Sequence, residues 1–158
     1  MAGGRAGRRL RRDVDEVAKP TSSAPLVKTL LVDTSVVSYL LKEHSLAALY
    51  RERLEGNLLG VSFMTIAELY CWPLQRAWGE KRFSDLKAHL SRYVVLAHDD
   101  AMSWEWAQLV SKKGRPMSFP DAWIGATALR YRVPLVTHNA RHFDHIAGLE
   151  VITVPKES

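Results

Sequence analysis

Three acidic residues border apolar stretches, where a folded chain would hold them on rigid elements. Asp33 follows Leu30-Leu31-Val32, Glu68 precedes Leu69, and Asp121 opens a run of small and apolar residues that ends at Leu129. Carboxylates gathered in one place repel each other, and a divalent cation is one of the usual remedies. Oxygen-only ligands suit hard ions such as Mg²⁺ or Mn²⁺, which can activate a water to hydrolyse a phosphodiester.

Other hydrolytic chemistries have no counterpart in the sequence. We find no Ser/His/Asp nucleophile set, no Walker phosphate loop and no Cys/His zinc spacing. Metal-assisted hydrolysis is therefore the chemistry that these residues favour. The competing interpretation is structural, because Asp is an ordinary helix cap and Thr65-Ile66-Ala67-Glu68 matches a capping box. We interpret Asp85, Asp99 and Asp100 as plain caps or surface charges.

The elements that must position these acids follow from the apolar pattern. It predicts strands at residues 26–32, 58–62, 93–97, 134–137 and 149–154. It predicts helices at about 34–42, 45–54, 65–78, 81–90, 99–113 and 120–131. Pro73 could kink the third of these helices.

Strands that alternate with helices predict an α/β fold with a mostly parallel central sheet between helical layers. In such open sheets, ligand sites form beyond the carboxyl ends of the strands. Asp33 directly follows the first strand, Glu68 lies just into the helix after the second, and Asn139 follows the fourth by two residues. These three residues are expected at one edge of the sheet, with Asp121 in the first turn of a buried helix.

Length and charge indicate one soluble domain with a basic extension. The chain has 158 residues and a formal net charge of +5. Residues 1–28 hold seven Lys/Arg against three Asp/Glu, so most of the excess charge lies there. We expect residues 1–26 to be a disordered basic tail and residues 27–158 to form the domain. The single cysteine fits a reducing compartment, so a cytoplasmic location is expected, and no apolar run approaches the roughly 20 residues of a membrane span.

From about Leu30 to Val154 the chain resembles the PIN domain family, in particular its VapC-type toxin ribonucleases. The stretches that carry the resemblance are Leu31-Val32-Asp33-Thr34-Ser35, Thr65-Ile66-Ala67-Glu68-Leu69, residues 121–129, and residues 134–143. The resemblance implies a three-layer α/β/α sandwich and an endoribonuclease dependent on Mg²⁺ or Mn²⁺. Asp33, Glu68 and Asp121 would be its metal ligands, and together they would activate the attacking water. Thr34 or Ser35 could position a ligand or the phosphate through a hydroxyl hydrogen bond.

The sequence departs from the family pattern at Asn139, where many members have Asp. Asn139 offers a carbonyl oxygen without a charge, so it is expected to make a weak or water-mediated contact. Asp144 is a candidate for an indirect, supporting carboxylate. The neutral Asn139 also keeps open an alternative function, a catalytically weak PIN-fold module that binds nucleic acid or a partner protein.

The resemblance further implies a cognate antitoxin of the VapB type and a homodimer, with RNA as the substrate. An antitoxin segment would then lie near the acids. Trp72 and Trp78, with their aromatic and apolar neighbours, could form a groove for a partner, although core packing is the alternative. Lys112, Lys113 and Arg115 precede the Asp121 helix and are candidates for phosphate contacts. Trp104 and Trp106 cannot share one helical face, so one of them is expected to be exposed.

Overall fold

A five-stranded parallel sheet forms the centre of the protein. The computed structural model describes residues 26–155. The strands are β1 (Thr29–Val32), β2 (Leu58–Ser62), β3 (Val94–Leu96), β4 (Leu135–Val136) and β5 (Val151–Ile152). They lie in the order β3-β2-β1-β4-β5, and every pair is parallel. This order places β1, which ends at Asp33, in the middle of the sheet.

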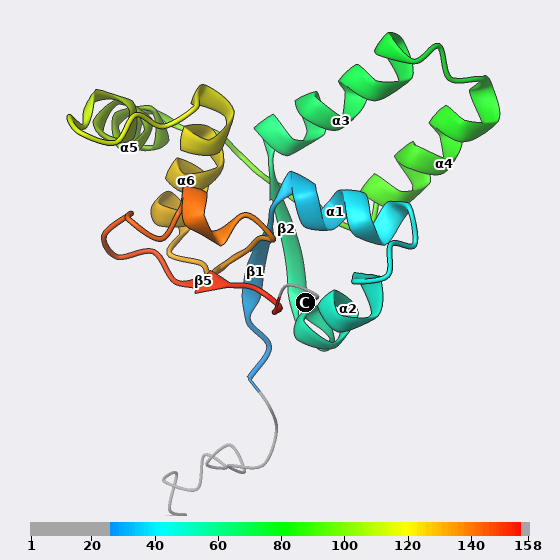
Figure 1. Cartoon of the computed structure of the whole chain (residues 1–158), viewed down its shortest axis with the longest axis horizontal. Coiled ribbons are helices and arrows are strands. Elements are labelled where there is room, and N and C mark those ends of the chain that lie inside the picture. The colour runs from blue at the N-terminus through cyan, green and yellow to red at the C-terminus, as the bar shows by residue number, and fades with distance from the viewer. Residues whose placement is uncertain (1–25, 156–158) are drawn as a thin grey trace, which may run out of the picture.

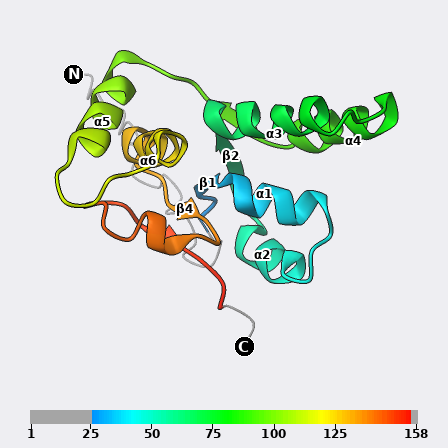
Figure 2. The same ribbon diagram turned by 45° about the horizontal axis from the view of Figure 1, so that its top comes forward.

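Six α-helices cover the two faces of this sheet. They are α1 (Thr34–Leu41), α2 (Ala47–Leu54), α3 (Phe63–Gln75), α4 (Glu80–Leu90), α5 (Asp100–Ser111) and α6 (Phe119–Tyr131). Helices α1 to α4 lie on one side of the sheet and α5 and α6 on the other (Figures 1 and 2). A short 3₁₀ helix, η1 (Ala140–His142), follows β4. Within residues 26–155, no helix is both long and apolar enough to cross a membrane.

The sheet separates two hydrophobic cores, as the alternation of side chains along a strand requires. Leu30 and Val32 of β1 belong to the core under α1 to α4. Leu31, between them, belongs to the core under α6, together with Ile124 and Phe143. A strand that is buried on both faces is typical of a parallel sheet between helices. The predicted three-layer α/β/α sandwich is therefore confirmed.

The elements agree with the sequence predictions in order and type, but the first and last strands are shorter than predicted. The strand predicted at 26–32 begins only at Thr29, because the neighbouring strand β2 starts opposite Thr29, at Leu58. Leu26 and Val27 have no strand to pair with and are 87% and 73% exposed. The last strand is also shorter than predicted, since β5 pairs with β4 at only two positions. The expectation of a disordered tail falls, except for Leu26, outside the described residues.

The helix expected to begin near Thr65 begins two residues earlier, at Phe63, and Ser62 caps it. The Ser62 hydroxyl accepts a hydrogen bond from the Met64 amide, and its backbone is extended, as in an N-cap. Thr65 therefore lies inside the helix and is fully buried. The capping-box interpretation of Thr65 and Glu68 is wrong, which removes the structural explanation for Glu68.

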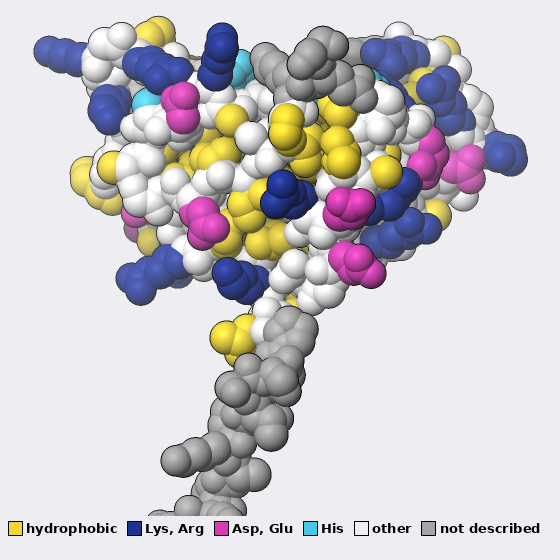
Figure 3. Space-filling model, turned by 60° about the horizontal axis from the view of Figure 1, so that its bottom comes forward, with side chains coloured by type: hydrophobic (Ala, Val, Ile, Leu, Met, Phe, Trp, Pro, Cys, Tyr) yellow, Lys and Arg dark blue, Asp and Glu magenta, His cyan; other side chains and the backbone are white. Residues whose placement is uncertain are grey.

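Charges of both signs are interspersed on the folded part. On the face in Figure 3, Lys and Arg side chains alternate with Asp and Glu around a hydrophobic strip. Residues 29–158 hold 15 Lys/Arg and 14 Asp/Glu, in keeping with this mixture. Any anion site on the domain must therefore come from local placement of charges rather than from overall charge.

Candidate active site

Asp33 lies at the carboxyl end of the central strand and is held by three hydrogen-bond donors. It is the N-cap of α1, and its Oδ1 accepts from the Thr34 amide at 2.8 Å. Its Oδ2 accepts from the Ser35 hydroxyl at 2.8 Å and from the Thr137 hydroxyl at 2.7 Å. The residue is only 4% exposed. A carboxylate with this many donors has a fixed orientation and retains its charge more readily than an unpaired buried acid.

Two backbone amides of the loop after β4 extend this network. The amide of Asn139 donates to Thr137 Oγ1 at 3.0 Å, and the amide of His138 donates to Ser35 Oγ at 3.2 Å. The parallel pairing of β1 with β4 brings these residues together across more than 100 positions of sequence. The loop that carries Asn139 is thereby tied to the Asp33 carboxylate.

Glu68 lies on α3 beside the start of α1. Its Oε1 accepts from the Thr34 hydroxyl at 2.9 Å. The same hydroxyl lies 3.0 Å from Thr65 Oγ1, one helical turn before Glu68. Thr34 thus links the first turn of α1 to α3. The prediction that Thr34 or Ser35 positions a ligand through its hydroxyl has a geometric basis, since each bonds to one of the acids.

Asp121 occupies the first turn of α6 without capping it. Ser118 is the N-cap, and its hydroxyl accepts from the Asp121 amide at 3.2 Å. The Asp121 carboxylate instead bonds to His142 Nδ1 of η1, with Oδ2 at 3.0 Å, and its side chain is 25% exposed. A negative charge at this end of a helix is favoured by the helix dipole.

The three acids, hereafter the acid cluster (Asp33, Glu68 and Asp121), are electrostatically coupled. Burial raises the pKa of Asp33, its three hydrogen bonds oppose that shift, and the charge of Asp121 adds to it. Burial is also the main cause that raises the pKa of Glu68, the Thr34 hydrogen bond opposes it, and both other acids add to it. The charge of Asp121 thus raises the pKa of both Asp33 and Glu68, and that of Asp33 raises the pKa of Glu68, so the three predicted acids lie within electrostatic range of one another.

The acid cluster suits a divalent cation by its chemistry. All its donors are carboxylate oxygens, which hard ions prefer, and a cation would relieve both the repulsion and the burial cost. Among the described residues, no three His, Cys, Asp or Glu side chains stand grouped around a common point as a formed metal site. Each carboxylate is instead bonded to a donor of the chain. Metal ligation by these residues stays a prediction.

Asn139 and Asp144, the two further candidates for the site, differ in their relation to the acid cluster. Asn139 is exposed, follows β4 by two residues, and lies on the loop that Thr137 and Ser35 tie to Asp33. Asp144 is turned elsewhere, because its Oδ1 accepts from Arg115 Nη1 at 3.1 Å and its side chain is 55% exposed. Asp99 is a plain cap, as predicted, with its carboxylate accepting from the Met102 amide.

Sequence reasoning missed the residues that hold the acids rather than the acids themselves. Thr137 and Thr65 are fully buried hydroxyls in contact with the network. Tyr50, also fully buried, places its hydroxyl 2.8 Å from His138 Nδ1 and so supports the loop after β4. The one available signal was polarity at a core position, since Thr137 ends a buried apolar strand.

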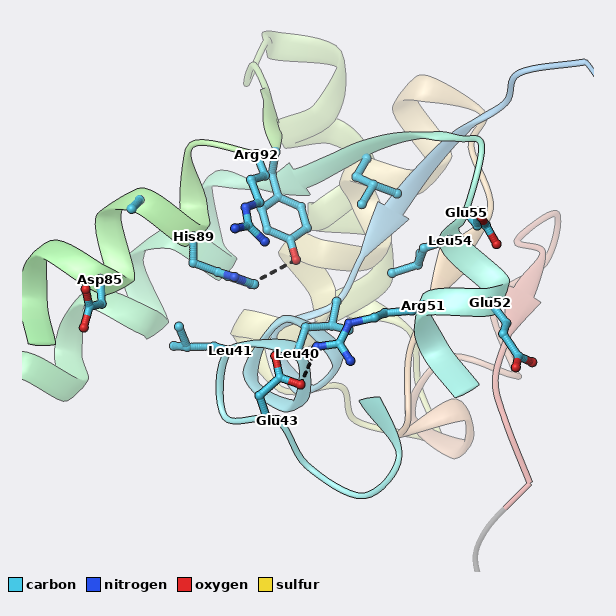
Figure 4. A pocket seen from close by; sticks show the side chains of 13 residues that line it. Leu40, Leu41, Glu43, Arg51, Glu52, Leu54, Glu55, Asp85, His89 and Arg92 are labelled. Carbon is cyan, nitrogen blue, oxygen red and sulfur yellow. Dashed lines mark hydrogen bonds and ion pairs between the residues drawn. The ribbon is translucent and has the colours of Figure 1, made fainter. Parts of the chain in front are cut away.

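A separate cavity of about 770 Å³ opens between the end of α1, α2 and α4. Leu40 and Tyr93 form part of its wall, and Glu43 and Arg51 form an ion pair across it (Figure 4). His89 Nε2 lies 3.2 Å from the Tyr93 hydroxyl, and burial lowers the pKa of His89. No member of the acid cluster lines this cavity, which lies at the far end of α1 from Asp33.

Comparison with known proteins agrees with this fold. The family model "PIN domain" matches residues 30–149. The chain is 32% identical to "Ribonuclease VapC4" of Mycobacterium tuberculosis over 65% of this chain and 82% of that protein. It is 29% identical to "Ribonuclease VapC1" of Haemophilus influenzae over 76% of this chain and 93% of that protein.

A solved structure shares the fold. A chain of VapBC2 from Rickettsia felis, determined bound to a DNA fragment from their promoter, matches with a TM-score of 0.71. The match covers 80% of this chain and 99% of that chain, at 22% identity. With a family model that covers most of the domain and relatives matched over most of their length, the chain belongs to the PIN domain family.

Proposed function

We propose that the chain is an endoribonuclease dependent on Mg²⁺ or Mn²⁺, and that it is the toxin of a toxin–antitoxin pair. The observation that carries the proposal is the acid cluster, in which the carboxylates of Asp33 after β1, Glu68 on α3 and Asp121 on α6 are electrostatically coupled. The names of the relatives, which are ribonucleases, supply the substrate class. RNA-cleaving hydrolysis is the activity that both support.

Asp33, Glu68 and Asp121 would hold the ion, and Asn139 would add a neutral carbonyl oxygen. When bound, the ion lowers the pKa of a water and offsets negative charge on the phosphate. The chain itself supplies orientation. Thr137 and Ser35 hold the Asp33 carboxylate, Thr34 holds Glu68, and His142 holds Asp121. A metal bound by all three acids would replace part of this hydrogen bonding.

Phosphate groups of the RNA would meet cations near the start of α6. Lys112, Lys113 and Arg115 precede that helix and are exposed, and Arg141 is exposed beside His142. Arg115 is held in place by Asp144 and by the Arg141 carbonyl oxygen. Such contacts position a nucleic acid without reading its sequence. They would place the backbone beside Asp121.

A cognate antitoxin and a second copy of the chain are the proposed partners. The Rickettsia felis relative is a VapBC assembly, and the family resemblance implies the same kind of partner here. Exposed apolar side chains on α3, Tyr70 at 39% and Leu74 at 84%, offer one surface that a partner would cover. Trp72 and Trp78 pack instead against the core beneath α1 to α4.

The proposal is tested by incubating purified, antitoxin-free protein with a panel of RNAs in Mg²⁺ or Mn²⁺, and in EDTA. We expect internal cleavage in either metal and none in EDTA. A folded protein that cuts no RNA in the panel would move the function to the alternative, a binding module. Cleavage that persists in EDTA would contradict the role of the metal.

A further inference from the structure

Phe119 is an exposed aromatic residue at the start of α6, the helix that carries Asp121. It is the first residue of α6, two positions before Asp121, and it is 65% exposed. The other three phenylalanines in the sequence, at positions 63, 83 and 143, are partly or fully buried. The Phe119 ring is therefore open to contact with a ligand.

The Phe119 ring stands on a platform of packed aromatic side chains. Trp106 of α5 stacks on Trp123 of α6, with ring centroids 4.9 Å apart and planes inclined by 18°. The Phe119 ring lies edge-on to Trp106 at 5.3 Å. Trp106 Nε1 also donates to the Phe119 carbonyl oxygen at 3.3 Å, which fixes the backbone that carries the ring. Phe63, at the start of α3, packs against Trp123 at 5.3 Å.

This arrangement leaves the Phe119 ring supported from below and open outward. Because α5 packs along α6, the platform is part of the fold rather than of a loop (Figure 1). A rigid ring loses little conformational entropy when another ring stacks on it. The geometry is that of a stacking surface for a planar group.

The charges around Phe119 favour a nucleic acid as the source of that planar group. The segment from Lys112 to Ser118 carries three cations and no acid, and leads directly into Phe119. Within residues 26–155, no ion pair engages Lys112 or Lys113, whereas Arg115 pairs with Asp144. Sites for single-stranded nucleic acid combine cations that follow the backbone with aromatic rings on which bases stack.

We propose that Phe119 stacks on an unpaired base of the bound RNA. This inference rests on the proposed function and adds to it a specificity, for single-stranded RNA with a base at that position. Purines, with the larger ring system, are preferred over pyrimidines there. Phe119 is thus a residue that positions the substrate and takes no part in bond cleavage.

The test measures binding rather than cleavage. Fluorescence anisotropy gives the Kd of the full chain, in EDTA, for labelled oligoadenylate, oligouridylate and a fully abasic sugar–phosphate oligomer of equal length. From the usual contribution of one stacked base, Phe119→Ala is expected to weaken oligoadenylate binding about 5- to 100-fold. Phe119→Trp, which retains a ring, is expected to bind at least as well as the wild type. Affinity for the abasic oligomer is expected to stay the same in both variants.

Trp104 offers a matched control on α5. Its side chain is 67% exposed, a fraction similar to the 65% of Phe119. Trp104 lies two positions from Trp106, so it faces away from the platform. Trp104→Ala is expected to leave all three affinities unchanged. Because both positions are exposed, each variant is expected to melt within about 2 °C of the wild type, since surface changes rarely exceed about 0.5 kcal/mol.

Three outcomes overturn the inference. They are an unchanged Kd of Phe119→Ala for oligoadenylate, an equal loss for the abasic oligomer, and no binding of oligoadenylate by the wild type. An antitoxin complex weakened by Phe119→Ala with RNA binding intact would assign the ring to the protein partner. These results are separable from the proposed function. RNA cleavage without a Phe119 effect refutes the stacking alone, and a Phe119 effect without cleavage refutes the nuclease alone.

Discussion

The hydroxyl of Thr137 donates to Asp33 Oδ2 at 2.7 Å and so joins the ends of the neighbouring strands β4 and β1. Both residues are buried, at 0% and 4% exposure. The contact favours the ionised form of Asp33, because it lowers a pKa that burial raises. A residue 104 positions away thereby offsets part of the effect of burial on this acid at the centre of the sheet.

Thr137→Val keeps the shape of the side chain and removes this hydrogen bond. We expect it to reduce the free energy of unfolding by about 1–2 kcal/mol at pH 7, since the carboxylate keeps its other donors. Loss of the bond raises the pKa of Asp33 further, so the variant gains stability relative to the wild type as pH falls and Asp33 is protonated. Urea denaturation at pH 7 and at pH 4 measures the difference.

Thr127→Val is the matched control for that measurement. Thr127 is also fully buried, but its hydroxyl lies against Trp123 O and Ser62 Oγ, without a carboxylate. Its destabilisation is expected to be similar at both pH values. A Thr137→Val cost that is independent of pH would show that the contact with Asp33 does not govern that acid's ionisation.

Glu68→Gln is expected to stabilise the metal-free protein at neutral pH. Burial raises the folded pKa of Glu68 above its unfolded value, so the group contributes most to stability below the unfolded pKa, and this contribution is lost as pH rises through the folded pKa. Gln keeps the acceptor for Thr34 and carries no charge. In EDTA, the difference in urea midpoint between variant and wild type should therefore grow from pH 4 to pH 7.

The same comparison of Glu68→Gln with the wild type is then repeated with Mg²⁺ in place of EDTA. If Glu68 helps to hold the ion, millimolar Mg²⁺ stabilises the wild type and cancels the advantage of the variant. Glu52→Gln, on the exposed face of α2, controls for general effects of removing a charge. A Glu68→Gln protein that is less stable than the wild type at pH 7 in EDTA would refute the repulsion within the acid cluster.

Asn139→Asp is expected to tighten metal binding. A fourth carboxylate raises the charge of the site, and the affinity of oxygen sites depends on the number of charged ligands. The Mg²⁺ concentration that gives half of the maximal rise in Tm should fall about three- to tenfold. In EDTA, the same variant should melt lower than the wild type, because a further negative charge is added.

Asn57→Asp serves as the control for this titration, since Asn57 lies before β2, at the opposite end of that strand from Ser62. If this Mg²⁺ concentration is the same for Asn139→Asp and the wild type, residue 139 does not coordinate the metal. If it falls in both Asn139→Asp and Asn57→Asp, the effect is due to net charge rather than to position.

Much of the fold and the identity of the acids could be predicted from the sequence. Buried parallel strands are short apolar runs, and each of the five was found by that pattern. The carboxyl edge of a parallel sheet follows from topology, which is why Asp33 and Glu68, 35 positions apart, could be placed together from the sequence alone. Trp104 is exposed and Trp106 is partly buried, as expected for two residues that cannot share a helical face.

The remainder depended on pairings between distant segments. The order of the strands decides that Thr137 meets Asp33, and no local pattern contains that order. Thr65 was misinterpreted because two nearby residues, Ser62 and Thr65, can both cap a helix, and the Ser62 backbone is the one that is extended. Asp144 bonds to Arg115, a partner 29 positions away, so its separation from the acid cluster could not be predicted.

Asp121 is proposed to bind the metal ion that cleavage requires, and the most direct test compares two substitutions of Asp by Asn in RNA cleavage. Asp121→Asn removes a carboxylate of the acid cluster, whereas Asp85→Asn removes an exposed carboxylate of α4 that pairs with Lys81. With Mg²⁺, we expect the cleavage rate of Asp121→Asn to fall at least about 100-fold and that of Asp85→Asn to change less than about threefold. Cleavage by a folded Asp121→Asn protein at the wild-type rate, with contaminating nuclease excluded, would contradict the assignment.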